Sequence, residues 1–576
     1  MVNRTIKLIL AVSILTAGLS LMAIAGGLLH LLLPLPAAAD SACGIFFLLA
    51  LISLNLLIYL QDRAVERGDY LGRRLHRRGY LWLAVLIGGQ LLLVGLNMLP
   101  ALFYSSRFNG AIYGGIYLLY LGLPAAGFVA ARESLAAVRA GFPLQWGRSL
   151  KGAGREGRFK KTVCTLCYLF LLAETASLYL FFSGDRSIFY ESAPQVVEVF
   201  LSGYSLYHAL VVLSTTVLLL KLQHRPGSAG TALTGALGLL CFGAYLLPLV
   251  AVPATCAGAD AEFTRVFGEA EPELSASGWR EHLQAKPFSL PAYFLGVPPG
   301  EYRYQKNVLF YEGGTSGADE GLKLHVDIFM PPAGGENLPG RGTALLRIHG
   351  GAWIAGDKGY GNMMQVNKYF ASRGYTVFDL QYGLTDRIRL TALQPYLGQA
   401  PGRVGPYTLD DMVRHLGIFT RYLAEHAAAY ELDLDSVFVS GGSAGGQLAT
   451  AVALALSGGG HGDLFSDELK IRGFLPLYPA NDTGFLPEIG GAAEWLDVAL
   501  LLDEQSPPCL LYQGRQDGQV SPETARRFQE TYCRAGNERC ALLEFNWAGH
   551  ASDFYFPGIF NQIWLYYMER FIALHR

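Results

Sequence analysis

Charged residues are scarce in this 576-residue sequence. Asp, Glu, Lys and Arg make up 16% of it, whereas a soluble globular chain carries roughly 25%. Hydrophobic residues make up 51%. The formal net charge is only −2, so the chain lacks the basic excess of a nucleic-acid-binding protein, and we expect no nucleic-acid partner. The length exceeds that of one domain, so at least two are expected.

Clusters of metal-ligating residues are also missing. Cys164 and Cys167 have the spacing of half a metal site, but no second pair or histidine cluster accompanies them. We therefore expect neither a metal nor another cofactor. Cys533 and Cys540 flank a short loop between a predicted helix and a predicted strand, which makes them candidates for a disulfide in an oxidising compartment.

The scarcity of charge is most marked in residues 1–255. A membrane span needs about 20 apolar residues, and a helix satisfies its own backbone hydrogen bonds in lipid. We therefore predict an N-terminal all-α transmembrane bundle of about seven helices over 1–255, followed by a connector over 256–300. The apolar stretches that support this are 8–33, 42–60, 80–99, 111–131, 162–182, 199–220 and 231–252.

Lys and Arg are distributed unevenly among the loops between these stretches. With the N-terminus in the cytoplasm, the inner segments contain eighteen basic residues, whereas the outer loops contain only Arg107 and Arg186. Inner loops carry the basic excess in membrane proteins. The sequence therefore predicts a multi-pass protein of the cell membrane, in contact with membrane lipids, whose C-terminal half is extracytoplasmic.

Residues 301–576 have the pattern of an α/β domain. Short apolar runs alternate with amphipathic helical segments, which indicates an eight-stranded, mostly parallel sheet covered on both faces. The first two strands form a hairpin around a Gly-rich turn. The predicted strands are 303–311, 322–330, 343–348, 375–380, 436–440, 471–477, 508–513 and 540–546, and the predicted helices are 361–373, 408–429, 444–457, 522–535 and 556–574.

A nucleophile motif joins the fifth of these strands to the following helix. Gly441-Gly442-Ser443-Ala444-Gly445 fits the pattern G-x-S-x-G. Small residues two before and two after the serine relieve crowding in a sharp strand-to-helix turn, which exposes the hydroxyl at the positive end of a helix. We expect Ser443 to be the nucleophile.

A second motif, His349-Gly350-Gly351-Ala352-Trp353, follows the third predicted strand. Consecutive small residues let backbone N–H groups point into a concavity, where they stabilise the oxyanion of a tetrahedral intermediate. We expect an oxyanion hole in which Gly350 shapes the loop and the flanking His349 and Trp353 border the substrate pocket. The expected N–H donors are Gly351, Ala352 and Ala444.

The remaining two catalytic candidates each follow a predicted strand. A serine hydroxyl needs a base, and the base needs an acid that fixes its tautomer. His550 and Asp517 fill these roles in the order Ser, Asp, His, which α/β-hydrolases use. Asp503 and Asp482 are weaker candidates for the acid, because they lie in a long connection.

These residues resemble the α/β-hydrolase fold, and within it the hormone-sensitive-lipase-like carboxylesterases. The segments "HGGAW" and "GGSAGG" carry the resemblance, and "HGGAWIAGDKG" is similar to the branch of bacterial esterases and isoprenylcysteine methylesterases. The resemblance covers about residues 300–576. It implies hydrolysis of carboxylic esters through an acyl-enzyme, without metal or cofactor.

Three positions depart from the family pattern. Many members have Asp before the nucleophile, where this chain has Gly442, and a third oxyanion glycine, where it has Ala352. Relatives also often show Asp-Tyr-Arg where this chain has Gln381-Tyr382-Gly383. These departures weaken any transfer of cap structure or substrate preference.

The sequence therefore predicts a membrane-anchored esterase or lipase. A deacylase of an acylated envelope glycan would use the same chemistry, and a binding protein with a retired hydrolase domain is an alternative of another class. The segment 383–407 is expected to cover the site, since it is long, unpatterned and rich in apolar residues. The acyl group, the alcohol and the oligomeric state stay open.

Overall fold

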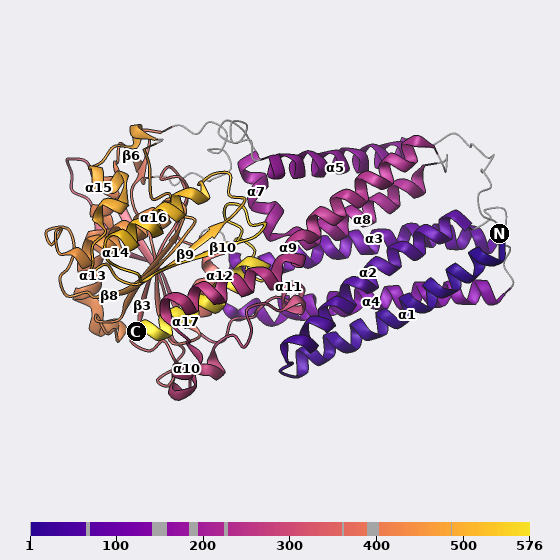
Figure 1. Ribbon diagram of the computed structural model, residues 1–576, viewed down its shortest axis with the longest axis horizontal. Coiled ribbons are helices and arrows are strands. Elements are labelled where there is room, and N and C mark those ends of the chain that lie inside the picture. The colour runs from indigo at the N-terminus through magenta and orange to yellow at the C-terminus, as the bar shows by residue number, and fades with distance from the viewer. Residues whose placement is uncertain are drawn as a thin grey trace.

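The computed structural model describes residues 2–64, 70–140, 158–183, 194–223, 228–359, 362–388, 402–484 and 486–576. Long helices of the N-terminal half lie at one end of the elongated molecule, and the C-terminal half with its sheet lies at the other (Figure 1). The two halves are joined by packing as well as by the chain, as described below.

Seven helices within the described residues are long and apolar enough to cross a membrane, judged by length and composition. This confirms the predicted number. They are α1 (Val2–Leu32), α2 (Ala37–Ala64), α3 (Tyr70–Met98), α4 (Asn109–Arg139), α5 (Arg158–Ser183), α8 (Ser205–Leu222) and α9 (Ala229–Phe267). We call this set the bundle. A short helix, α7 (Pro194–Gly203), precedes α8.

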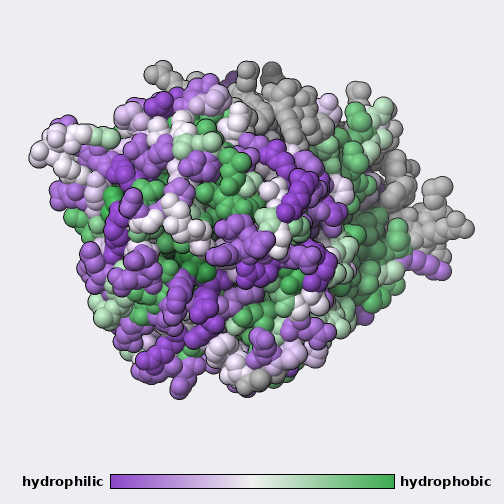
Figure 2. Space-filling view, turned by 60° about the vertical axis from the view of Figure 1, so that its left-hand side comes forward, coloured by the Kyte–Doolittle hydropathy of each residue, from purple (hydrophilic) through white to green (hydrophobic). Residues whose placement is uncertain are grey.

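The surface of the bundle is as apolar as a membrane requires. Among the described residues, large hydrophobic side chains that are exposed gather on the bundle, and the only four beyond its end are Tyr304, Leu309, Val404 and Leu500. In Figure 2, hydrophilic residues cover much of the near face, whereas hydrophobic ones form the flank towards the bundle. Lipid-facing side chains explain this asymmetry.

The predicted division at residue 255 falls inside α9, which continues to Phe267. Beyond it come α10 (Glu271–Ser277), a 3₁₀ turn over Trp279–His282 and α11 (Leu290–Leu295). The far end of α9 lies along an edge strand of the sheet. Its Glu262 accepts a hydrogen bond from the Leu542 N–H of that strand, at 3.2 Å. The domain boundaries of 255 and 300 stay a prediction.

The C-terminal half is built on one eight-stranded sheet, as the alternating pattern predicts. The strand order is β1-β2-β4-β3-β7-β8-β9-β10, with β1 and β2 antiparallel and the strands from β4 onward parallel. The bounds are β1 (Arg303–Glu312), β2 (Lys323–Met330), β3 (Ala344–Ile348), β4 (Thr376–Leu380), β7 (Val437–Gly442), β8 (Ile471–Leu477), β9 (Cys509–Gly514) and β10 (Cys540–Phe545).

Helices cover both faces of the sheet. One face packs against α12 (Met363–Ala371) and α17 (Ile559–His575), and the other against α13 (Leu409–His426), α14 (Ala444–Gly458) and α16 (Pro522–Arg534). The core on the first face continues without a break into the bundle, where Tyr120 and Phe294 belong to the same buried cluster as Tyr512. The two halves therefore share one apolar core.

The disulfide predicted between Cys533 and Cys540 is wrong, because all eight cysteines are free thiols. Cys540 is buried in β10, where its register partner is Cys509 of β9. Cys533 is exposed on α16. The short loop between the helix and the strand suggested proximity, but it carried no information about which way each side chain points.

A buried lysine links the halves. Lys368 on α12 donates hydrogen bonds to the carbonyl of Pro100, at 2.7 Å, and to that of Phe103, both at the end of the bundle. Leaving buried acceptors unpaired costs about 1–3 kcal/mol. We expect Lys368→Met to lower the melting temperature of the detergent-purified protein by several degrees.

The matched control is Lys470→Met. Lys470 is 66% exposed and pairs with Asp435 at 2.7 Å, and such surface pairs contribute about 0–1 kcal/mol. Its melting temperature should stay within about a degree of wild type. Equal shifts in the two variants would contradict a role for Lys368 in joining the halves.

Candidate active site

Ser443 occupies a strained turn between β7 and α14. Its φ of 57° and ψ of −123° lie outside the regions that non-glycine residues ordinarily adopt. It is the residue immediately before α14, so its side chain stands at the helix N-terminus. Strain held by the surrounding packing is typical of functional sites, and this is the backbone shape expected of the G-x-S-x-G motif.

The glycines of the motif are required by close backbone contacts. A Cβ on Gly441 would lie 2.3 Å from the Gly445 carbonyl oxygen, and a Cβ on Gly445 would lie 2.2 Å from that of Ile348 in β3. Real Cβ atoms essentially never approach so closely. The serine turn can therefore pack against β3 only without side chains at these two positions.

The structure brings Ser443, His550 and Asp517 together. His550 Nε2 lies 3.0 Å from Ser443 Oγ. His550 Nδ1 lies 2.9 Å from Oδ2 and 3.1 Å from Oδ1 of Asp517. Asp517 follows β9 and His550 follows β10, so all three side chains meet at the carboxyl ends of parallel strands, where open α/β sheets place their sites. This is the geometry of a nucleophile, a base and an orienting acid.

The surroundings of His550 stabilise the protonated, positively charged form of its imidazole. Burial alone would lower the pKa of His550, but the charge and hydrogen bond of Asp517, together with the charges of Glu198 and Asp553, outweigh it, and the net effect is a raised pKa. Asp517 is itself held by the N–H groups of Gln519 and Val520, at 2.9 and 2.8 Å. A fixed carboxylate of this kind orients the ring and stabilises the imidazolium.

The predicted oxyanion loop lies against the serine turn. A Cβ on Gly350 would stand 2.7 Å from the Gly442 carbonyl oxygen. Gly351 and Ala352 have φ values of 120° and 53°. Within the described residues, their N–H groups donate to no protein acceptor. Together with the N–H of Ala444, the first residue of α14, they are free to receive an oxyanion.

His349 and Trp353 do not face an open pocket. Trp353 is 2% exposed, and its Nε1 donates to Gln447 Oε1 at 3.2 Å, inside the core beneath α14. His349 is fully buried, and its ring stacks on Tyr382 at 4.4 Å. Burial, followed by the charge of Arg403, lowers the pKa of His349 to about 4. Both residues pack beneath the oxyanion loop. The structure therefore corrects the prediction that they border the substrate pocket.

Two further residues beside the catalytic histidine were not found from the sequence. Tyr478 follows β8, its ring lies 4.6 Å from the His550 ring, and its hydroxyl donates to Asp553 at 2.6 Å. A Cβ on Gly442 would lie 3.0 Å from the Tyr478 hydroxyl. The Tyr478 hydroxyl therefore leaves little room for a side chain at position 442. The sequence signal that could have found Tyr478 was its position directly after a predicted strand.

The alternative acids lie elsewhere. Asp482 forms an ion pair with Arg527, and Asp503 accepts a hydrogen bond from the Ser506 hydroxyl at 3.1 Å. Neither contacts His550. Asp517 is therefore the acid that the geometry supports.

The predicted cover segment is described only at its two ends. β5 (Leu384–Thr385) and β6 (Val404–Gly405) form a short parallel ladder. The Thr385 N–H donates to the Trp353 carbonyl at 2.9 Å, which fastens this end beside the oxyanion loop. The prediction depended on apolar residues that lie outside the described residues, namely Leu390, Leu393, Tyr396 and Leu397.

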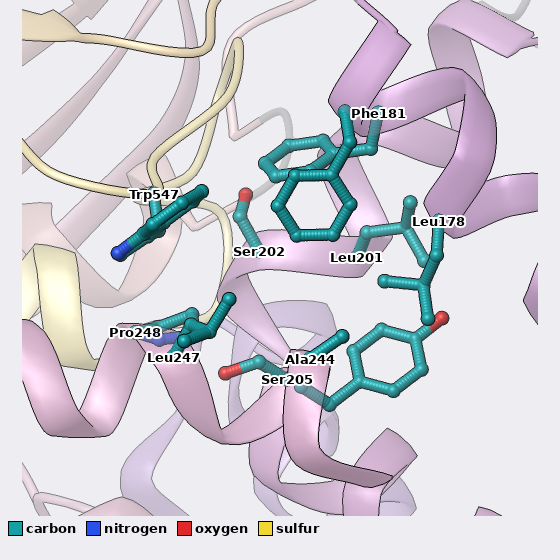
Figure 3. A pocket seen from close by; sticks show the side chains of 11 residues that line it. Leu178, Phe181, Leu201, Ser202, Ser205, Ala244, Leu247, Pro248 and Trp547 are labelled. Carbon is teal, nitrogen blue, oxygen red and sulfur yellow. The ribbon is translucent and has the colours of Figure 1, made fainter. Parts of the chain in front are cut away.

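An apolar pocket lies between the bundle and the loop that carries His550 (Figure 3). Side chains from α5, α7, α8 and α9 line it, among them Phe181, Leu201 and Pro248. Trp547, three residues before His550, closes it from the other side. Its ring contacts that of Phe182 edge-on, with the centroids 5.5 Å apart.

The chain is similar to known proteins over part of its length. Residues 345–494 match the family described as alpha/beta hydrolase fold. The chain is 23% identical over 265 residues to a probable carboxylic ester hydrolase, LipM, of Mycobacterium tuberculosis, covering 42% of this chain and 56% of the relative. It is 23% identical over 249 residues to a probable isoprenylcysteine alpha-carbonyl methylesterase of Arabidopsis thaliana, covering 38% and 46%. The chain thus spans about half the length of these relatives.

Among solved structures, the apo form of esterase 2 of Thermogutta terrifontis aligns with 48% of this chain and 91% of its own, at 22% identity and a TM-score of 0.35. The C-terminal half of the chain has the α/β-hydrolase fold, as predicted. The predicted resemblance to esterases of this fold is confirmed, and from here we call this half the hydrolase domain.

The contact between Gly445 and β3 gives a direct test of the serine turn. Gly445→Ala should reduce labelling of Ser443 by a fluorophosphonate probe at least about tenfold, because displacing a reacting group by 1 Å can cost about a hundredfold. Gly458→Ala, in the same helix, is the control, since its nearest neighbour would be 3.7 Å away. Normal labelling of Gly445→Ala would contradict the role of this contact.

Proposed function

We propose that the protein is a membrane-anchored serine carboxylesterase or lipase that acts on the extracytoplasmic side of the cell membrane. The observation that carries the proposal is the hydrogen-bonded chain from Ser443 Oγ through His550 to Asp517. An unactivated serine is a weak nucleophile, and this arrangement is the one that activates it.

The chemistry follows from the geometry. His550 Nε2 takes the proton of Ser443 as Oγ attacks the ester carbonyl carbon, and Asp517 stabilises the imidazolium. The carbonyl oxygen becomes an oxyanion that accepts hydrogen bonds from the N–H groups of Gly351, Ala352 and Ala444. His550 then protonates the departing alcohol, and an acyl-enzyme remains. A water molecule, deprotonated by His550, attacks the acyl carbon and releases the acid and free Ser443.

The orientation of the site towards the bundle favours a lipidic ester. The loop bearing His550 packs on α7, and its Trp547 borders the apolar pocket of Figure 3 together with bundle helices. A substrate with an acyl chain in the membrane would reach this edge of the sheet without leaving apolar surroundings. Deacylation of an acylated envelope glycan would use the same residues and differ in the alcohol.

The extracytoplasmic location rests on sequence alone. An odd number of spans puts the two ends of the bundle on opposite sides, and the basic loops favour a cytoplasmic N-terminus. A binding protein with a retired domain is disfavoured, because Ser443, His550 and Asp517 are all in place for catalysis.

Activity-based labelling tests both parts of the proposal. A membrane-impermeant fluorophosphonate probe should label the wild-type protein in intact cells, and Ser443→Ala should remove the signal. Labelling only after permeabilisation would overturn the location and keep the chemistry. Absence of labelling even then, in a protein shown to be folded, would overturn the enzymatic function.

The role of Asp517 as the acid can be tested by replacing its carboxylate with an amide. Asp517→Asn should lower kcat on a short p-nitrophenyl ester by a factor on the order of 10⁴, as when the wrong imidazole tautomer is held in the serine-protease triad. Asp503→Asn is the control and should retain wild-type kcat. A larger loss in the control would reassign the acid.

A further inference from the structure

A carboxylate from the membrane half reaches the catalytic residues. Glu198 lies on α7, which directly precedes the membrane-spanning α8. Its Oε1 accepts hydrogen bonds from the His550 N–H at 2.7 Å and from the Gly518 N–H at 2.9 Å. One oxygen atom therefore ties together the loop that carries the base and the loop that carries the acid.

Glu198 packs closely against the loop that carries His550. Glu198 is 2% exposed. A Cβ on Gly549 would stand 2.6 Å from Glu198 Cγ and Oε1, so a side chain at position 549 would displace Glu198 from this position. The second carboxylate oxygen, Oε2, is buried and has no hydrogen-bond partner among the described residues. Burying an oxygen atom without a hydrogen-bond partner costs free energy.

Aromatic contacts hold α7 in this position. The Tyr555 hydroxyl, on the segment after His550, donates to the Tyr293 carbonyl at 2.7 Å and lies 3.1 Å from the Tyr207 hydroxyl of α8. The Tyr293 hydroxyl donates to the carbonyl of Gly203, the last residue of α7, at 3.1 Å. The position of Glu198 is thus fixed by the packing of the bundle on the hydrolase domain.

We infer that Glu198 is a positioning residue that the membrane half contributes to the active site, where it holds the His550 and Asp517 loops in register and supports the charged form of His550. The inference rests on the proposed function. It gives α7 and the helices behind it a part in catalysis beyond anchoring.

The charges around Glu198 agree with this role. Burial, followed by the negative charge of Asp517, raises the pKa of Glu198 to about 7, against the N–H groups of Gly518 and His550. The groups that face His550 are Asp517, Asp553, Tyr478 and Glu198, and the carboxylates among them raise the pKa of its imidazole. The charge of Glu198 is therefore one of those that raise the pKa of His550.

Ionisable groups on the helices beside α7 are engaged elsewhere. Glu174 of α5 accepts a hydrogen bond from the Tyr245 hydroxyl of α9 and lies 3.0 Å from His208 Nδ1 of α8. This cluster is satisfied within the bundle and makes no contact with Glu198 among the described residues. Glu198 of α7, rather than Glu174 of α5, is thus the carboxylate that contacts the catalytic loops.

Two substitutions separate positioning from charge. Glu198→Ala removes the acceptor of both N–H groups, and we expect kcat on a p-nitrophenyl ester to fall by about tenfold to a hundredfold with little change in KM. Glu198→Gln keeps an oxygen acceptor but cannot ionise. It should restore kcat at alkaline pH to within about threefold of wild type, since neutral acceptors form weaker hydrogen bonds.

The pH profile is the readout that a purely structural role would not move. His550 must be neutral to accept the serine proton, so kcat/KM rises with pH through its pKa. Loss of the Glu198 charge lowers that pKa, and the acid limb of Glu198→Gln should move to lower pH by roughly half a unit. Glu262→Ala is the matched control, because Glu262 also joins a bundle helix to a strand N–H, at 3.2 Å, but lies away from the triad.

The outcomes are distinct. Loss in Glu198→Ala, rescue and a shifted limb in Glu198→Gln, and wild-type kinetics in Glu262→Ala support the inference. Wild-type kcat in Glu198→Ala, an unshifted limb in Glu198→Gln, or an equal loss in Glu262→Ala overturns it. If Glu198→Ala fails to fold, the limb of Glu198→Gln decides. A wild-type protein without esterase activity or probe labelling would instead overturn the proposed function.

Discussion

Close backbone contact around Ser443 is the constraint on which the rest of the site depends. The serine turn, β3 and the oxyanion loop approach one another so closely that Gly350, Gly441 and Gly445 have no room for a Cβ. This contact sets the distance between the nucleophile and the N–H groups that would receive the oxyanion. It also aims Ser443 Oγ at His550, which arrives from the other side on the loop after β10. Because backbone rather than flexible side chains makes these contacts, the geometry is preorganised before substrate binds.

Much of this was predictable from the sequence because it depends on local patterns. Strands and helices follow from hydrophobic periodicity, and each predicted strand of the main sheet corresponds to one in the structure. The serine turn and the oxyanion loop follow from motifs whose steric demands lie in consecutive residues, whereas Asp517 and His550 follow from their order in the chain and their positions after predicted strands. Seven spans follow from the length and composition of the apolar stretches.

What the sequence did not predict depends on the direction of side chains and on contacts between distant elements. Trp353 seemed suited to wall a pocket, but its ring turns inward to Gln447. Cys540 is separated from Cys533 by a short loop, yet it lies in a strand beside Cys509. Tyr478, which follows β8, lies so close to Gly442 of β7 that a Cβ there would be 3.0 Å from its hydroxyl. Local spacing carries no information about such pairings.

The contact between Glu198 and the His550 loop is another that local sequence patterns did not predict. It gives the membrane half a role beyond anchoring. A carboxylate near the end of an apolar stretch is ordinarily a residue of the membrane interface, and nothing nearby in the sequence connects it with a histidine 352 positions later. In the fold, Glu198 of α7 is hydrogen-bonded to the loops that follow β9 and β10. One anchor helix would be enough to keep a hydrolase at a membrane. A bundle whose core continues into the catalytic domain can instead fix the loops of the triad, so that movement of the membrane helices would be felt at His550. Under the proposed function, the seven apolar helices are then part of the framework of the active site rather than a tether.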